Sequence, residues 1–158
     1  MEGRIMSARV DGVEYIRFNG VIRYSQCAGL ESHIEKLFQQ PNFSEIAIDL
    51  EHAEMLDSTA LGLLARIAIE FKKLSDNRPV IFLRRGELAH ILKRVCFDQV
   101  FNIVTQVKSS DDMDFVEIAS VANSEENILK CVLEAHKNLA EISNKNSHYF
   151  TDITQALN

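Results

Sequence analysis

Short apolar segments alternate with amphipathic ones from residue 46 to residue 105, and this alternation limits the folds that the chain can adopt. Ile46–Leu50 is rich in β-branched residues and nearly all apolar, as expected of a strand that is covered on both faces. The predicted elements that follow are a helix, a strand, a helix and a strand, at Ser58–Leu74, Val80–Leu83, Glu87–Val95 and Val100–Thr105. Strands that alternate with helices form parallel pairs, because each connecting helix packs back on the sheet.

The N-terminal part of the chain predicts a hairpin and a helix. Ile5–Val10 and Val13–Phe18 flank an Asp-Gly turn signal, and Gly20 marks a break after the second strand. Ser25–Gln40 has the apolar spacing of a helix. We therefore expect an α/β fold in which helices pack on a mixed sheet of about five strands.

Two further helices are predicted beyond the last strand, at Asp111–Ala122 and Glu125–Ile142, with Ser124 as an N-cap of the second. These helices either cover the apolar surface of the domain itself or supply a dimer or partner contact. The polar segment 144–158 is expected to be loose. We divide the chain into a domain at residues 1–106 and a helical extension with a polar tail at residues 107–158.

Composition argues against several classes of function. The 23 acidic and 17 basic side chains give a net charge of −6, which disfavours nucleic-acid binding. A local basic cluster has the character of a solvated helix face and loop: Arg84, Arg85, Lys93 and Arg94. The histidines lack the close spacing of a zinc site, and no glycine-rich phosphate loop is present. We therefore expect neither a metal nor a cofactor.

The cysteines and the apolar segments indicate the cellular compartment in which the protein is expected. Cys27, Cys96 and Cys131 are odd in number and form no C-x-x-C pair, which favours free thiols in a reducing compartment. No apolar run is long enough to cross a membrane, and the first ten residues lack the apolar core of a signal peptide. A cytoplasmic protein without direct membrane binding is expected.

The segment Leu50–Leu64 leads from the buried strand through a short loop into a helix. Asp57 is a natural N-cap, so Ser58 takes the first helical position, and we expect its side chain to point toward solvent. A phosphate on Ser58 would add about −1.5 to −2 charges, which free amides and the helix dipole would stabilise. A partner docked flush on the same surface would have to bury that charge and would be released.

Two other interpretations of Ser58 stay open. Asp-Ser-Thr before a helix is often a capping sequence and nothing more. Alternatively Ser58 is a nucleophile, which requires a base and an oxyanion site beside it. No G-x-S-x-G elbow surrounds Ser58, and His52 in the preceding loop is the one histidine close to it in sequence. We therefore expect no enzymatic activity.

Asp57-Ser58-Thr59-Ala60-Leu61-Gly62 resembles the D-S-[ST]-[GA]-L-G signature of STAS domains, and more specifically that of bacterial anti-sigma-factor antagonists. The resemblance extends from about Ile5 to Thr105 and includes the Asn19-Gly20 end of the second strand. It implies that Ser58 is the residue that becomes phosphorylated. It also implies a partner-binding surface at Asp57, Ser58, Thr59, Ala60, Arg23 and Met55.

The resemblance implies a partner-switching cycle. The unphosphorylated antagonist binds an anti-sigma factor, usually a serine kinase of the histidine-kinase-like ATPase fold, and thereby frees a sigma factor or a similar regulator. The kinase phosphorylates the antagonist with ATP, and a PP2C-like serine phosphatase reverses the step. The alternative within the fold is an unphosphorylated scaffold subunit of a stress-sensing or membrane-transport complex. Ser58 directly after Asp57 favours the phosphorylated switch.

Two positions depart from the family pattern. Ala60 stands where many members have glycine, and because alanine is the better helix former, the helix start should be firmer. Arg23 stands where many members have an aspartate in a G-x-x-D pattern. Arg23 would pair with a phosphate on Ser58 if the two residues lie close together, whereas the commoner state of an arginine is a solvated one.

Overall fold

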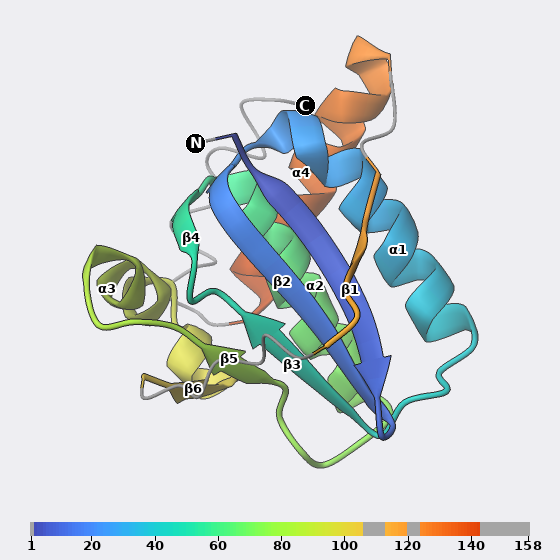
Figure 1. Ribbon diagram of the computed structural model, residues 1–158. Coiled ribbons are helices and arrows are strands. Elements are labelled where there is room, and N and C mark those ends of the chain that lie inside the picture. The colour runs from blue at the N-terminus through green and yellow to red at the C-terminus, as the bar shows by residue number, and fades with distance from the viewer. Residues whose placement is uncertain (1, 106–112, 120–123, 143–158) are drawn as a thin grey trace.

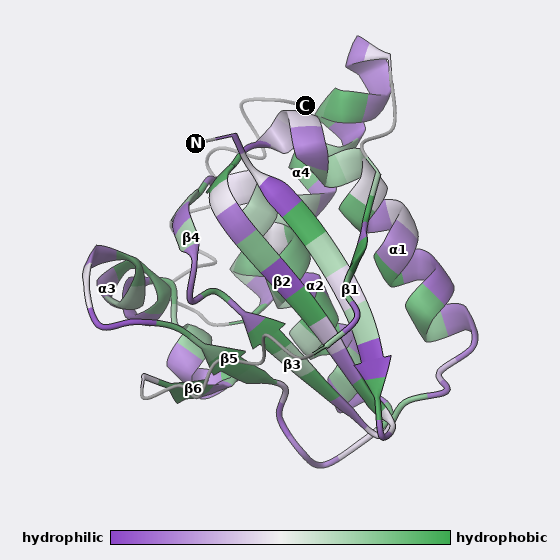
Figure 2. Ribbon diagram, viewed as in Figure 1, coloured by the Kyte–Doolittle hydropathy of each residue, from purple (hydrophilic) through white to green (hydrophobic). Residues whose placement is uncertain are grey.

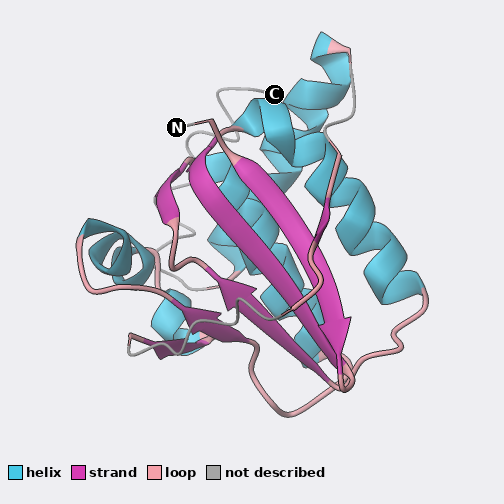
Figure 3. Cartoon of the chain, in the orientation of Figure 1, coloured by secondary structure: helices cyan, strands magenta, loops and turns pink. Residues whose placement is uncertain are grey.

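The structure is a computed structural model of the 158-residue chain, and it describes residues 2–105, 113–119 and 124–142. Within these residues, seven strands form one mixed sheet in the order β6-β5-β3-β2-β1-β7, with β4 paired to the end of β2 (Figures 1 and 3). The strands are β1 (Arg4–Val10), β2 (Val13–Ile22), β3 (Glu45–Asp49), β4 (Ala53–Leu56), β5 (Val80–Phe82), β6 (Asn102–Val104) and β7 (Val116–Glu117). The α-helices are α1 (Cys27–Gln39), α2 (Ser58–Lys72), α3 (Glu87–Arg94) and α4 (Glu125–Glu141), and short 3-10 helices span η1 (Tyr24–Gln26) and η2 (Phe97–Gln99).

The predicted mixed sheet is confirmed. β1 and β2 form an antiparallel hairpin, and β2, β3, β5 and β6 follow in parallel. Ile46, Ala47 and Ile48 are all buried, as the apolar run predicted for a strand in the middle of a sheet. Figure 2 shows β3 and β5 as mainly hydrophobic.

β2 is longer than predicted, and Gly20 lies inside it. Gly20 has a φ of +76°, and the register with β4 shifts between Gly20 and Val21. Glycine tolerates this left-handed conformation, so the strand continues through an irregularity to Ile22. The predicted break at Gly20 is therefore wrong, and the continuation of β2 gives β4 a partner that local sequence did not reveal.

The first predicted C-terminal helix, Asp111–Ala122, is wrong over Val116–Glu117, which form β7. β7 pairs antiparallel with β1, with Met6 opposite Glu117, and so satisfies part of an otherwise open sheet edge. The second predicted helix is confirmed as α4, capped by the Ser124 side chain, which accepts from the Asn127 amide. The predicted loose tail, 144–158, lies outside the described residues.

The helices form two layers behind the sheet. In Figure 1, α2 runs behind the sheet and α4 passes behind α2 in turn. α2 is therefore buried on two sides, and ten of its fifteen residues are buried. α3 lies apart from this stack, beside η2 and β4. No helix among the described residues has the length and apolar character needed to cross a membrane.

Ile48 in β3 is fully buried at the centre of the core. We expect Ile48→Ala to lower the free energy of unfolding by about 2–5 kcal/mol, because it removes buried methyl groups and leaves a cavity. Urea denaturation would measure this as a lower midpoint at an unchanged m-value. Val10→Ala at the exposed end of β1 is the control, with an expected change below about 0.5 kcal/mol. Equal effects of the two substitutions would contradict the placement of the core.

Candidate functional site

Asp57 holds the start of α2 in place. The Asp57 amide donates to the carbonyl of Ile22 in β2 (3.1 Å). Its carboxylate Oδ1 accepts from the amide of Ala60 (2.9 Å), and Oδ2 accepts from the amide of Tyr24 (2.6 Å). Asp57 is thus the N-cap predicted from the sequence, and it also ties η1 to the same point.

Ser58 is the first residue of α2, as predicted, but its side chain does not point freely into solvent. The residue is half-buried, and its Oγ lies 2.9 Å from Nε2 of His136 in α4. Either atom donates in this hydrogen bond, depending on which ring nitrogen of His136 carries the proton. The predicted acceptor hydroxyl is therefore covered by a helix from the C-terminal part of the chain.

One turn further along α2, the two helices come into backbone contact. Gly62 and Ala65 share a face with Ser58, four and seven residues on. A Cβ on Gly62 would collide with the carbonyl group and the side chain of Ala135 in α4. A residue without a side chain is therefore required at position 62 while α4 is in this place.

His136 is buried, with 6% of its surface exposed. Burial lowers the pKa of its imidazole, and the negative charge of Asp57 opposes this shift without reversing it. The net direction is downward from the ordinary value of 6.5, so the imidazole facing Ser58 is held toward its neutral form.

The buried thiols of Cys27 and Cys131 lie in the same region, and each is near enough to Asp57 for its charge to raise the thiol pKa. Burial is the largest cause in both cases, and it raises the pKa of Cys131 to about 12. Such thiols are poor nucleophiles while they stay buried.

A neutral imidazole beside a serine hydroxyl can accept its proton, so the structure supplies the base that the nucleophile interpretation lacked. Both carboxylate oxygens of Asp57, however, already accept hydrogen bonds from backbone amides, one from Ala60 at the start of α2 and one from Tyr24 in η1. This carboxylate therefore serves as a helix cap, whereas the acid of a catalytic triad orients the histidine ring.

The other predicted site residues divide into a buried and an exposed group. Thr59 and Ala60 are buried, at 3% and 0% exposure. Arg23 is exposed, and so is Met55 at 43%. Tyr24, which sequence analysis did not single out, is 51% exposed and follows Arg23 directly. Exposed residues thus precede Asp57 in β4 and lie at η1, whereas Thr59 and Ala60 at the helix start are buried.

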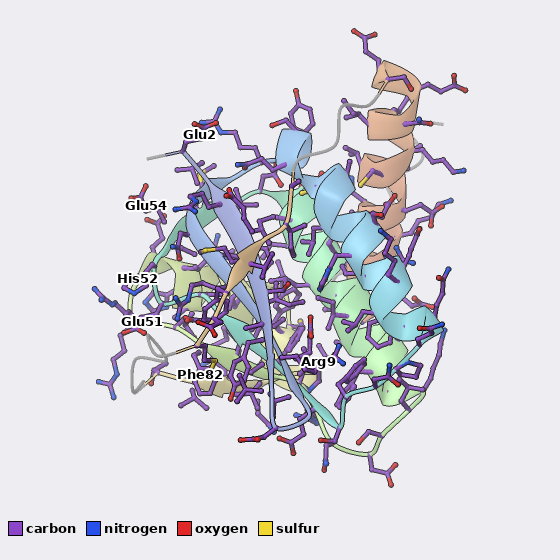
Figure 4. The ribbon with its side chains drawn as sticks, turned by 45° about the vertical axis from the view of Figure 1, so that its right-hand side comes forward. Glu2, Arg9, Glu51, His52, Glu54 and Phe82 are labelled. Carbon is purple, nitrogen blue, oxygen red and sulfur yellow. The ribbon has the colours of Figure 1, made fainter. Side chains whose placement is uncertain are left out.

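His52, the histidine nearest to Ser58 in sequence, is not the one that contacts it. His52 is exposed in the turn between β3 and β4. In Figure 4 it lies beside Glu51 and Glu54, on the side of the molecule away from α1 and α4. His136 was missed because 78 residues separate it from Ser58. The sequence feature that could have identified His136 is its position beside Ala135 on the apolar stripe of the second C-terminal helix.

Comparison with known proteins gives one family and several similar folds. The family described as "STAS domain" matches residues 4–110. The unphosphorylated anti-sigma factor antagonist SpoIIAA is 13% identical, with a TM-score of 0.54 over 69% of this chain and 91% of that one. An anti-sigma factor antagonist from Mycobacterium paratuberculosis is 21% identical, with a TM-score of 0.54 over 70% and 90%. None of the curated proteins matches this chain in sequence.

The environment of His136 predicts a pH effect on stability. Its pKa is lower in the folded chain than in the unfolded chain, so below about pH 6.5 the unfolded chain binds more protons. The free energy of unfolding should therefore fall as the pH drops through and below 6.5. We expect His136→Gln to lose this part of the pH dependence, measured by urea denaturation between about pH 7.5 and 5.5. His90→Gln on the exposed side of α3 is the control and should follow the unmodified chain. An unchanged pH profile of His136→Gln would contradict the prediction.

Proposed function

Because the chain belongs to the STAS domain family, we propose that it is an anti-sigma-factor antagonist whose partner binding is switched by phosphorylation of Ser58. The observation that carries the proposal is the position of Ser58, directly after the Asp57 cap at the first residue of α2. Two solved structures of similar fold are themselves described as anti-sigma factor antagonists.

The start of α2 is suited to a phosphate. Free amides and the positive end of the helix dipole favour an anion there, so phosphorylation would leave the fold of the sheet intact. Asp57 is already anionic at this end, and a phosphate would concentrate negative charge beside it. The effect of phosphorylation is therefore expected on the contacts made at the start of α2.

Exposed side chains next to the cap form the proposed partner-binding surface. Arg23, Tyr24 and Met55 supply its solvent-facing part, and Asp57 and Ser58 supply the charge-sensitive centre. Thr59 and Ala60 are buried, so they contribute by holding the backbone of the helix start. A partner that covers this surface would bury a phosphate dianion, and a cost of about 4 kcal/mol lowers affinity roughly a thousandfold.

Membership of the family supports the following partners. The unphosphorylated chain would bind an anti-sigma factor that is also a serine kinase of the histidine-kinase-like ATPase fold. A PP2C-like serine phosphatase would restore the hydroxyl. The chain itself supplies the acceptor and acts in the cytoplasm. We expect Arg23 to pair with the phosphate, and the contact between the neighbouring Tyr24 amide and Asp57 supports this expectation.

The Ser58–His136 contact favours a second candidate, a serine nucleophile with His136 as its base. A fluorophosphonate reagent separates the two functions, because it labels activated serine nucleophiles. We expect no labelling of Ser58. Stoichiometric labelling that disappears in His136→Gln would replace the proposed switch with a hydrolytic site.

The proposed function predicts that the protein isolated from its host cells carries a single phosphate on Ser58, located by mass spectrometry. Ser58→Ala should still bind the kinase, whereas Ser58→Asp should bind about a thousandfold more weakly, measured by calorimetry. Ser58→Ala removes the His136 contact, whereas the carboxylate of Ser58→Asp can accept a hydrogen bond from the imidazole, so the comparison measures the added charge together with any change in this contact.

Ser44→Asp is the matched control, because Ser44 is exposed and lies beside Gly12 at the hairpin turn, on another part of the sheet. It should bind like the unmodified chain. Equal affinities of Ser58→Ala and Ser58→Asp would defeat the proposed switch.

A further inference from the structure

α4 occupies the face of α2 on which Ser58 lies. Nε2 of His136 is within hydrogen-bond distance of the hydroxyl, and Ala135 abuts Gly62 one turn further on. Phosphoryl transfer requires the acceptor oxygen in line with the phosphorus and close to it. In this arrangement the imidazole fills one approach to Oγ, and the backbone of α4 limits the space around it.

The docked position of α4 also conflicts with the product. The Oγ and Nε2 atoms are 2.9 Å apart, which leaves no room for a phosphoryl group between them. A phosphate on Ser58 and α4 in its present place therefore exclude each other along this direction. The same holds for a partner that covers the start of α2 from the side of α4.

α2 and α4 form the most extensive helix–helix contact among the described residues. α4 begins at Glu125, beyond the residues matched by the STAS family, and its buried residues are Cys131, Ala135, His136 and Leu139. One of these four is a polar side chain that has to be desolvated. Cys131 and Leu139 belong to the hydrophobic core, and Ala140 and Ile142 pack against it, so this apolar stripe is exposed when α4 leaves α2.

A polar groove of about 550 Å³ runs beside the contact, between α1, α2 and α4. Its acidic side chains come from all three helices: Glu31, Glu35, Glu70 and Glu134. Arg66 and Lys130 offset only part of this charge. Water therefore reaches the flank of α4, and three of these carboxylates are ion-paired, Glu35 with Arg66, Glu70 with Lys73 and Glu134 with Lys137.

We propose that α4 is an intramolecular cover of Ser58, and that kinase and partner gain the site only when α4 leaves α2. This inference rests on the proposed function and adds a regulated step to it. Because coupling is reciprocal, whatever displaces α4 raises the affinity of the partner for the site, and partner binding displaces α4. The Ser58–His136 hydrogen bond holds the cover closed, and phosphorylation prevents it from closing again.

A thiol in place of the hydroxyl measures the cover without any kinase. Three full-length variants are compared: Ser58→Cys by itself, Ser58→Cys combined with Ala135→Arg, and Ser58→Cys combined with Leu129→Arg. An arginine at position 135 cannot fit against Gly62, whereas Leu129 is 44% exposed on the same helix and gives the same change of charge. Alkylation by iodoacetamide is followed at each cysteine by mass spectrometry.

We expect the introduced thiol and Cys131 to react at least about tenfold faster with Ala135→Arg than with Leu129→Arg. Cys96 is buried near η2, away from α4, and should react slowly in all three chains. Equal reactivity of the introduced thiol in the three chains would overturn the inference. A parallel rise at Cys96 would overturn it too, because α4 would then be inseparable from the rest of the fold.

Phosphorylation itself is compared in chains that keep Ser58. With the kinase captured from host cells and ATP, Ala135→Arg should acquire phosphate at least about tenfold faster than Leu129→Arg. Equal phosphorylation rates of the two variants, in spite of faster alkylation of Ala135→Arg, would contradict the inference that α4 covers Ser58. The proposed function would be unaffected. No phosphate on Ser58 in any chain would defeat the proposed function, while the alkylation rates would still decide whether α4 covers the site.

Discussion

The carboxylate of Asp57 joins the segments that meet at the carboxyl end of β2. It accepts from the amides of Tyr24 and Ala60, while the Asp57 amide donates to Ile22. An anion is favoured at this point, because the first turn of a helix has free amides and a positive dipole end. The place of Ser58 follows from these bonds, since the first residue of α2 cannot shift unless one of them breaks.

The burial of α2 on two sides explains the residues of its outer face. The inner face packs on the sheet with large apolar side chains, as Leu64 and Phe71 do. The outer face has to admit the backbone of α4, so a residue without a side chain stands at Gly62. A hydroxyl at a helix contact of this kind is stable when it has a hydrogen-bond partner, and His136 provides one.

The proposed phosphate acceptor, Ser58, and its proposed cover, α4, come from different parts of the chain. The STAS domain supplies a rigid helix start on a buried sheet, and the C-terminal part supplies a histidine that competes with solvent for the same hydroxyl. A fold alone does not specify function, and here the chemical character of the site depends on a contact outside the family's matched residues. Burial keeps His136 toward its neutral form, so the contact is a hydrogen bond between uncharged groups.

Local sequence determined the elements whose signals are short-range. The apolar run at Ile46–Leu50, the spacing along α2 and the cap at Asp57 each depend on neighbours within a few residues, and all three are found as expected. Ser58 at the first helical position follows from the same cap. The tertiary structure alone decided what depends on distant partners. β4 exists because β2 continues past Gly20, and Val116–Glu117 form a strand because the edge of β1 is open to them. The sequence places a hydroxyl at a helix start, but the packing of α4 on α2 decides that this hydroxyl faces an imidazole, because residues 78 positions apart meet only when two helix faces fit together.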